Sequence, residues 1–192
     1  MSDFHPAEYG PVFAELIDAE RLPSLGPGTP DRELRGRLSS LTASEAFAHV
    51  PMAEKTYSAA CLSGLWLLHD FLEESHTISQ QIGNATGSFW HGIMHRREGD
   101  FGNSKYWFRR VGHHPVFVAL ARETTALTRS QNDLPAEAEY LTEQSDWDPY
   151  RFVDLCEQFV GSGTQDETFL QHLQMLEWQL LFDDSYRHAV AV

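Results

Sequence analysis

The sequence has no long apolar run. No stretch of roughly 18 consecutive apolar residues occurs among its 192 positions, and a membrane-spanning helix needs about that length or more. The first ten residues, MSDFHPAEYG, contain neither the basic segment nor the apolar core of a secretory signal peptide. We therefore expect a cytoplasmic protein that has no membrane as a partner.

Cysteine is scarce, and the two that occur, Cys61 and Cys156, both lie in apolar helical patterns. A disulfide between them is one alternative. The favoured alternative is that both cysteines are buried, reduced thiols, which are typical of cytoplasmic proteins. The sequence also lacks the Cys-x-x-Cys pair of zinc and redox sites, the glycine-rich phosphate loop, the Gly-x-Ser-x-Gly elbow and the His-Glu-x-x-His motif.

Positive charge is scarce too. Lys and Arg number 14 against 28 Asp and Glu, which gives a net charge of -14 at pH 7. A field of that sign repels nucleic acids and anionic membrane surfaces, so we expect neither as a partner. With 42% hydrophobic and 12% aromatic residues, the chain is nevertheless too apolar to be disordered.

Strand patterns are absent as well, and apolar residues recur at helical spacing. We predict an all-α, single-domain helical bundle around a central helical hairpin formed by residues 52 to 97. Proline at a first helical position, or a capping box, marks the start of several helices. The predicted helices cover residues 11 to 20, 52 to 76, about 79 to 97, 115 to 129, 149 to 160 and 165 to 183.

The intervening stretches are predicted to be less regular. Residues 1–51 form an irregular arm that packs on a core of residues 52–192. Within the arm, besides the helix at 11 to 20, we predict a short helix from Asp31 to Leu38 and a short turn capped by Thr42 and Glu45, whereas the run LPSLGPGTP excludes helix and central strand. Residues 98–113 are predicted to form an ordered loop or short turn. Residues 130–148, which are acidic and polar, are predicted to form a surface loop.

Histidine is plentiful, with ten residues. On the predicted helix 52 to 76, His69, Glu73 and His76 are spaced i, i+4 and i+7, which places them on one side. On the next helix, His91 and His95 are spaced i and i+4, which lets two imidazoles reach one metal ion. The alternative is that the polar stripe carrying His91 and His95 faces water.

Taken in chain order, the pattern His-x3-Glu, His-x3-His and His-x4-Glu resembles the ligand pattern of hemerythrin-type bundles, which hold a pair of irons. The resemblance implies as ligands His69, Glu73, His91, His95, His172 and Glu177. The sequence departs from the family pattern in the long interval between His95 and His172. It also has Glu where the third acid of that pattern is Asp, and only His5 or His49 is available as the early histidine.

The densest segment is HRREGDFGNSKYWFRRVGHHP, residues 95 to 115. Residues 95 to 129 carry seven basic and three acidic side chains, a net charge of +4 in a chain that is otherwise at -18. Arginine suits bidentate recognition of carboxylate or phosphate, and the aromatic side chains at 106 to 108 offer stacking faces. Two interpretations stay open: a site for a small anion, or internal pairing of the arginines with acidic side chains.

The stretch HGIMHRREGDFGNSKYWFRRVGHHP, residues 91 to 115, resembles a segment of uncharacterised helical proteins. The resemblance covers about 25 residues. It implies that the stretch is one unit, and it implies no activity.

These patterns predict a helical protein with a His-, Glu- and Arg-lined pocket for a divalent metal ion or non-heme iron, for a small anionic ligand, or for both. The predicted metal ligands are His69, Glu73, His91, His95 and His172. If the pocket is an active site, acid–base catalysis falls to His91, His95, Glu98 and Asp100. The predicted anion-binding residues are Arg96, Arg97, Asn103, Lys105, Tyr106, Arg109, Arg110 and His113. The alternative is a non-catalytic interaction or scaffold protein that forms a homodimer through the basic, aromatic segment 95 to 114.

Overall fold

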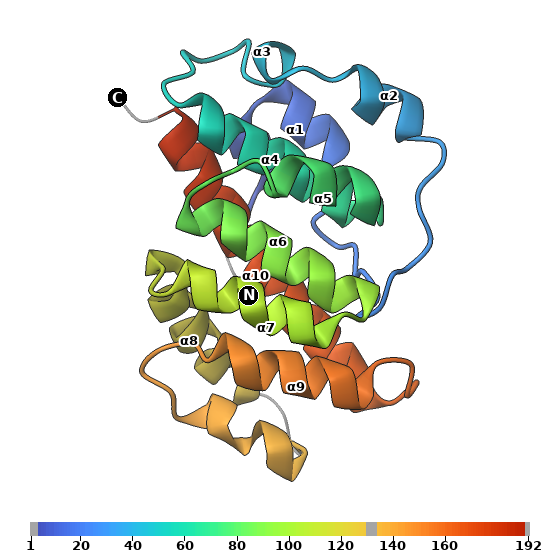
Figure 1. Cartoon of the computed structure of the whole chain (residues 1–192), viewed down its shortest axis with the longest axis vertical. Helices are drawn as coiled ribbons and strands as arrows, with labels where there is room; N and C mark the ends of the chain where they lie inside the picture. The colour runs from blue at the N-terminus through green and yellow to red at the C-terminus, as the bar shows by residue number, and fades with distance from the viewer. Residues whose placement is uncertain (1–3, 130–133, 191–192) are drawn as a thin grey trace.

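A computed structural model describes residues 4–129 and 134–190, and within these ranges the chain forms helices and no strand, which confirms the all-α prediction. In Figure 1, α4 and α5 lie end to end at the top of a layer, α6, α7 and α9 lie successively below them, and α10 runs behind. These helices are α4 (Lys55–Leu68), α5 (Leu72–Ser79), α6 (Ala85–Glu98), α7 (Phe101–Val111), α9 (Pro149–Phe159) and α10 (Gln165–Ala189). None of the helices in the described ranges is both long and apolar enough to cross a membrane.

The N-terminal segment packs on this layer and shares its core. It forms the short helices η1 (Pro6–Tyr9), α1 (Pro11–Leu16), α2 (Arg35–Ser40) and α3 (Ala43–Ala46). Phe13 is fully buried, and its ring lies 5.2 Å from that of Phe47 and 5.3 Å from that of Phe182 on α10. Aromatic side chains of this kind bury large apolar areas, so the segment contributes directly to the hydrophobic core.

Proline and capping residues begin several helices at the predicted positions. Pro11, Pro115 and Pro149 open α1, α8 (Pro115–Thr128) and α9. The hydroxyl of Thr164 accepts a hydrogen bond from the backbone N–H of Glu167 at 3.2 Å and caps α10, which packs against α4, α8 and α9. The predicted starts of these helices are therefore confirmed, because proline and capping side chains satisfy or remove free N–H groups at a helix start.

The predicted continuous helix 52 to 76 is wrong, because the chain breaks at Asp70. Asp70 has a positive φ of 64°. Its N–H donates to the carbonyl of Leu67, and the N–H of Phe71 donates to that of Trp66 at 3.0 Å, while the rings of Trp66 and Phe71 pack edge to face. This is a Schellman ending with aspartate where glycine is usual. The C-terminal part of the predicted helix becomes the separate helix α5.

The stretches on either side of α6 also differ from the prediction. The second helix of the hairpin begins at Ala85 rather than near residue 79, because Asn84 caps it. Residues 98–113, predicted as a loop, contain the helix α7, which buries Ser104, Phe108 and Val111 on one face. The part of 130–148 that the structure describes contains the helix η2 (Ala136–Thr142) and is partly buried; residues 130–133 lie outside the described ranges.

Candidate metal centre

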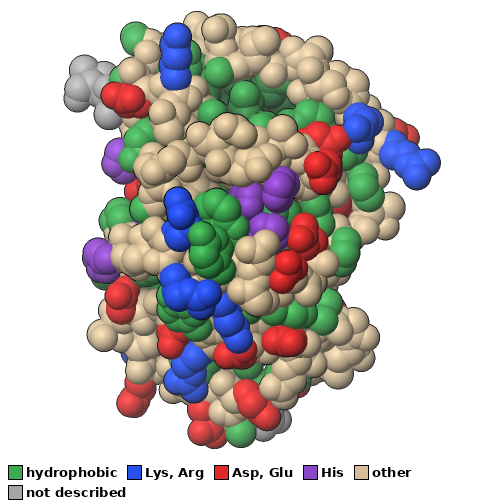
Figure 2. All heavy atoms as spheres, viewed as in Figure 1, with side chains coloured by type: hydrophobic (Ala, Val, Ile, Leu, Met, Phe, Trp, Pro, Cys, Tyr) green, Lys and Arg blue, Asp and Glu red, His purple; other side chains and the backbone are tan. Residues whose placement is uncertain are grey.

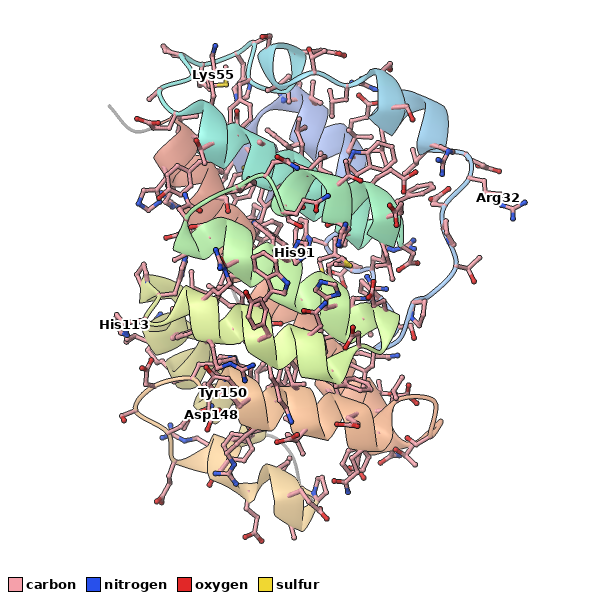
Figure 3. All side chains as sticks on the ribbon, in the orientation of Figure 1. Arg32, Lys55, His91, His113, Asp148 and Tyr150 are labelled. Carbon is pink, nitrogen blue, oxygen red and sulfur yellow. The ribbon has the colours of Figure 1, made fainter. Side chains whose placement is uncertain are left out.

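Three histidines from two neighbouring helices meet on one face of the molecule. His76 lies in the last turn of α5, and His91 and His95 lie one turn apart on α6. One ring nitrogen of each lies within 4.8 Å of the other two. Figure 2 shows histidine side chains at the centre of this face, and Figure 3 labels His91 in the layer between α5 and α7. We call His76, His91 and His95 the histidine cluster.

A tight connection between α5 and α6 brings the cluster together. Asn84 caps α6 by accepting a hydrogen bond from the N–H of Gly87 at 2.9 Å. A Cβ at Gly87 would lie only 2.4 Å from the carbonyl oxygen of Ile82, so only glycine permits this turn. The short connection packs the last turn of α5 against α6, and the ring centroids of His76 and His91 are 4.6 Å apart.

Ser79 orients the ring of His91. The hydroxyl of Ser79 lies 3.3 Å from the carbonyl oxygen of His76 and 2.8 Å from Nδ1 of His91. The shorter contact engages Nδ1 of His91, and a neutral imidazole whose other nitrogen offers a lone pair is the form that ligates metals.

Glu98 and Asn103 both contact the ring of His95. Nδ1 of His95 donates to Oε1 of Glu98 at 2.9 Å, because a carboxylate can only accept. The amide nitrogen Nδ2 of Asn103 lies 3.0 Å from Nε2 and 3.4 Å from Nδ1 of the same ring, so it packs over the ring face and not along the lone pair of Nε2. Metal-binding histidines usually donate their other N–H to a carboxylate, a carbonyl or water, so the hydrogen bond to Glu98 is the one expected at a metal site.

The cluster is largely closed to solvent. His91 is 1% exposed and His95 5% exposed, whereas His76 is half-buried. The indole of Trp107, on α7, lies 4.1 Å from the ring of His91. Burial, together with the charges of His95 and His76, lowers the pKa of His91 to about 3. His91 is therefore neutral at pH 7.

These donors suit a single transition-metal ion. A tetrahedral zinc ion with Zn–N bonds of about 2.0–2.1 Å holds its nitrogens roughly 3.3 Å apart, whereas the three ring nitrogens here lie within 4.8 Å of one another, so metal binding would draw the rings together. Three imidazoles leave one coordination position for water or an anion. Within the described residues, the other group with metal-ligand spacing is His95, Glu98 and Asp100, whose two acids are exposed; it shares His95 with the cluster.

The structure does not bring the other predicted metal ligands to the cluster. His69 is buried, and its Nε2 lies 2.8 Å from the carbonyl oxygen of Leu16. Glu73 is exposed in the first turn of α5. His172 is exposed on α10, where it lines a groove of about 320 Å³ that contains no residue of the cluster. The ligand set implied by the hemerythrin-type pattern is therefore not assembled, because the break at Asp70 and the course of α10 separate its members.

Arg96 and Arg97, predicted to bind an anion, are buried in the interior instead. Arg96 donates to Oε2 of Glu177 at 2.5 Å, and both side chains have no exposed surface. Arg97 donates to Oδ1 of Asp70 at 2.5 Å and to the carbonyl of Leu67 at 2.8 Å. For these two residues the prediction of anion binding is wrong and the alternative of internal pairing is confirmed. Glu177, implied as a metal ligand, is the partner of Arg96.

Lys105 and His113 lie outside the cluster. The ammonium group of Lys105 pairs with Asp154 on α9, and this exposed ion pair joins α7 to α9. His113 is exposed beyond the end of α7, and its Nδ1 is 3.8 Å from a carboxylate oxygen of Asp146. In the described part of the chain, no contact joins Lys105 or His113 to the histidine cluster.

Arg109 and Arg110 remain on the surface of α7. The guanidinium of Arg109 lies 5.8 Å from the ring of Tyr106, which is 46% exposed, and that of Arg110 lies 5.0 Å from the ring of Trp107. Among the described residues, neither arginine forms an ion pair. Trp107 also contacts His91, so the unpaired cation Arg110 is connected to the histidine cluster through the ring of Trp107.

Sequence reasoning missed His76 as a ligand, as well as Ser79 and Trp107. His76 was grouped with His69 and Glu73 through the spacing of an unbroken helix, and the break at Asp70 removes that relationship. A signal was present, because Asn84 with Gly87 three positions later marks the start of α6. The connection between α5 and α6 is then short, which places residues 76 to 79 against the start of α6.

Comparisons with known proteins found no match to this chain. No protein-family model matches the chain, no curated protein matches it, and no solved structure matches it.

Proposed function

We propose that the protein binds one divalent transition-metal ion through His76, His91 and His95. The observation that carries this proposal is the convergence of three ring nitrogens within 4.8 Å, two of them from rings whose Nδ1 is held by Ser79 and by Glu98. Zinc suits an all-imidazole set of three ligands, and non-heme iron or another transition metal that accepts imidazole is the next choice.

A small anion or water completes the coordination of this ion. Three protein ligands and one exchangeable ligand are typical of zinc sites at which chemistry takes place, since the ion polarises what it binds. Arg110, stacked on Trp107 beside His91, supplies an unpaired positive charge near the open position. This arrangement supports binding, and activation, of a small anionic ligand at the metal.

Metal analysis of the untagged protein tests the proposal. We expect close to one equivalent of metal after purification or after loading with Zn²⁺, and loss of it in His76→Ala and in His91→Ala/His95→Ala. His172→Ala is the matched control, since His172 is an exposed histidine that lies outside the cluster. The His76 variant separates this site from the hemerythrin-type set, which does not include His76.

Two results would contradict the proposal. One is an absence of stoichiometric Zn²⁺, Fe²⁺, Co²⁺ or Ni²⁺ binding by the wild-type protein. The other is equal retention of metal by His76→Ala and the control. In either case the cluster would be a hydrogen-bonded group of neutral histidines that stabilises the contact between α5 and α6.

A second candidate function is self-association through α7. It is favoured by Arg109 and Arg110, which are exposed and lack ion pairs among the described residues, on a chain with a net charge of -14. Such asymmetry suits pairing with the acidic surface of a second copy. Sedimentation of the wild type and of Arg109→Ser/Arg110→Ser at low and high salt tests it: a dimer that dissociates in salt or in the variant supports it, and a monomer throughout contradicts it.

A further inference from the structure

Trp107 lies against the histidine cluster because α7 is fixed at Gly92, the residue that follows His91. The hydroxyl of Ser104 donates to the carbonyl oxygen of Gly92 at 2.7 Å. The ring of Phe108 packs directly on Gly92, where a Cβ would lie only 3.1 Å from the Cε2 atom of the ring. Positions 104, 107 and 108 are neighbours on one side of a helix. The side of α7 that is anchored on α6 therefore also carries the indole to His91.

Trp107 separates His91 from the solvent. The centroids of the two rings are 4.1 Å apart, so the rings are in direct contact. His91 is 1% exposed whereas Trp107 is half-buried, so the indole forms the outer layer at this point. The exposed guanidinium of Arg110 lies 5.0 Å from the indole. His76 has the largest exposed fraction of the three cluster residues, so solvent reaches the cluster beside His76.

We propose that Trp107 is a cover that restricts the exchangeable ligand of the metal ion to compact anions such as formate. The inference rests on the proposed function and deepens it, because it names the class of ligand and the residue that selects it. A ligand of the metal beside His91 shares its space with the indole. A carboxylate that carries a ring requires the indole to be displaced, whereas formate does not. Arg110 adds a positive charge that favours an anion over a neutral ligand.

Formate and benzoate are the two probes, because both present one carboxylate and they differ by the ring. Trp107→Phe and Trp107→Ala reduce the cover in two steps. Tyr150→Ala is the matched control, since it removes a ring that is 37% exposed from the first turn of the neighbouring helix α9. All four proteins are compared as untagged full-length chains, with urea midpoints measured to show that folding is retained.

The two affinities are measured on the Co²⁺-loaded proteins by the change of the Co²⁺ absorption during titration with formate or benzoate. We expect Trp107→Ala to bind benzoate roughly tenfold more tightly than wild type, with Trp107→Phe between them, the size of effect by which a pocket discriminates between ligands of different bulk. The affinity for formate should change much less than that for benzoate, and Tyr150→Ala should equal wild type for both anions.

A readout without metal tests the cover itself. Diethyl pyrocarbonate acylates accessible imidazole nitrogens, and mass spectrometry of the peptides gives the rate at each histidine. We expect His91 to react on the order of tenfold faster in Trp107→Ala than in wild type, because a covered group reacts only when the structure opens locally. His114 is buried elsewhere and His172 is exposed. Both should keep their wild-type rates, which excludes a general loss of structure.

Each outcome decides between the proposals. Equal affinities of wild type and Trp107→Ala for benzoate, with Co²⁺ bound by both, overturn the cover and leave the metal site standing. Equal gains for formate and benzoate show that the indole blocks every ligand, which overturns selection. If wild type binds no metal, the proposed function fails and the selection of ligands fails with it, while the labelling of His91 still decides whether Trp107 closes the cluster.

Discussion

Nδ1 of His95 lies 2.9 Å from Oε1 of Glu98, three residues further along α6. The carboxylate is partly exposed, with 39% of its side-chain surface accessible, whereas the imidazole is buried. The hydrogen bond therefore connects a buried ring of the cluster to a carboxylate at the protein surface. A carboxylate in this position orients the ring and makes the opposite nitrogen more basic, which strengthens a metal bond through Nε2.

This pair yields the first prediction. Replacing the carboxylate of Glu98 by an amide in Glu98→Gln keeps a hydrogen-bond acceptor but removes its charge. We expect the affinity for Zn²⁺ to fall by about tenfold, the lower end of the effect seen when such partners are removed. The free energy of unfolding should change by less than about 0.5 kcal/mol, because Glu98 is exposed.

Competition with a chelator measures the affinity, and urea unfolding measures stability. Glu157→Gln, an equivalent change at an exposed position on α9, is the control. Should Glu98→Gln bind Zn²⁺ as tightly as wild type, Glu98 has no part in holding the metal-binding form of His95.

The second prediction concerns the buried pair of Arg96 and Glu177. Removing one partner leaves the other charge buried without a counter-ion, so we expect Glu177→Leu to lower the free energy of unfolding by roughly 3–5 kcal/mol. The double variant Arg96→Met/Glu177→Leu should be more stable than the single variant, because it leaves no unpaired charge. Urea unfolding of Glu177→Leu, Arg96→Met and the double variant measures the coupling energy between the two residues. Strictly additive effects of the two substitutions would contradict the prediction.

Much of the fold could be predicted from local sequence. Prolines and capping residues act on the N–H groups of their own first turn, so Pro115, Pro149 and Thr164 identify helix starts without knowledge of the rest of the chain. The break at Asp70 could not be predicted in this way. Aspartate adopts a positive φ at some cost, and here Arg97 and Arg21 both donate to its carboxylate from distant positions.

In the candidate site, too, only the features that depend on local sequence could be predicted. The spacing of His91 and His95 within one helix was enough to pair them. The roles of Arg96 and Arg97 were not predictable, because α6 is buried on nearly all sides from Thr86 to Arg97. Its charged side chains must then find partners in the interior, and those partners, Glu177 and Asp70, come from other helices or connections.

The third prediction concerns the close contact between α4 and α6. A Cβ at Gly64 would lie 2.9 Å from the Cη2 atom of Trp90, a fully buried ring whose Nε1 donates to the hydroxyl of Ser185. We expect Gly64→Ala to lower the free energy of unfolding by about 1–3 kcal/mol, because overpacking outweighs the helix preference of alanine.

Gly36→Ala is the matched control, since Gly36 lies within α2 and a Cβ there meets nothing within 4 Å. It should be neutral or stabilising by up to about 1 kcal/mol. Thermal or urea unfolding compares the two variants, and equal stabilities would show that Trp90 yields to the added methyl group.

The fourth prediction concerns the pH dependence of stability. His114 caps α8: its Nδ1 accepts from the backbone N–H of Val116 at 3.3 Å, and its Nε2 contacts the hydroxyl of Thr86 at 3.1 Å. Burial, with the charges of His188 and His113, lowers the pKa of His114 from 6.5 to about 4. Protonation would remove the acceptor and place a positive charge at a helix N-terminus, which is unfavourable.

The folded-state pKa of His114 is below its unfolded value, so the unfolded chain binds more protons between these two values. Stability is therefore complete above about pH 6.5 and is lost as the pH falls toward 4, by up to about 3 kcal/mol from this residue. The carboxylate of Asp184, 3.8 Å from Nε2, attracts the proton and reduces this loss.

His114→Asn isolates this effect, because asparagine caps a helix well and does not titrate. We expect the variant to be less stable than wild type at pH 7, where it lacks the contact with Thr86, but to lose less stability between pH 6.5 and 4.5. Urea unfolding over this range measures both slopes. His172→Asn, at an exposed histidine, should keep the wild-type slope. Parallel curves for wild type and His114→Asn would assign the acid sensitivity to other groups, because only a buried neutral imidazole that gains its proton on unfolding produces the difference.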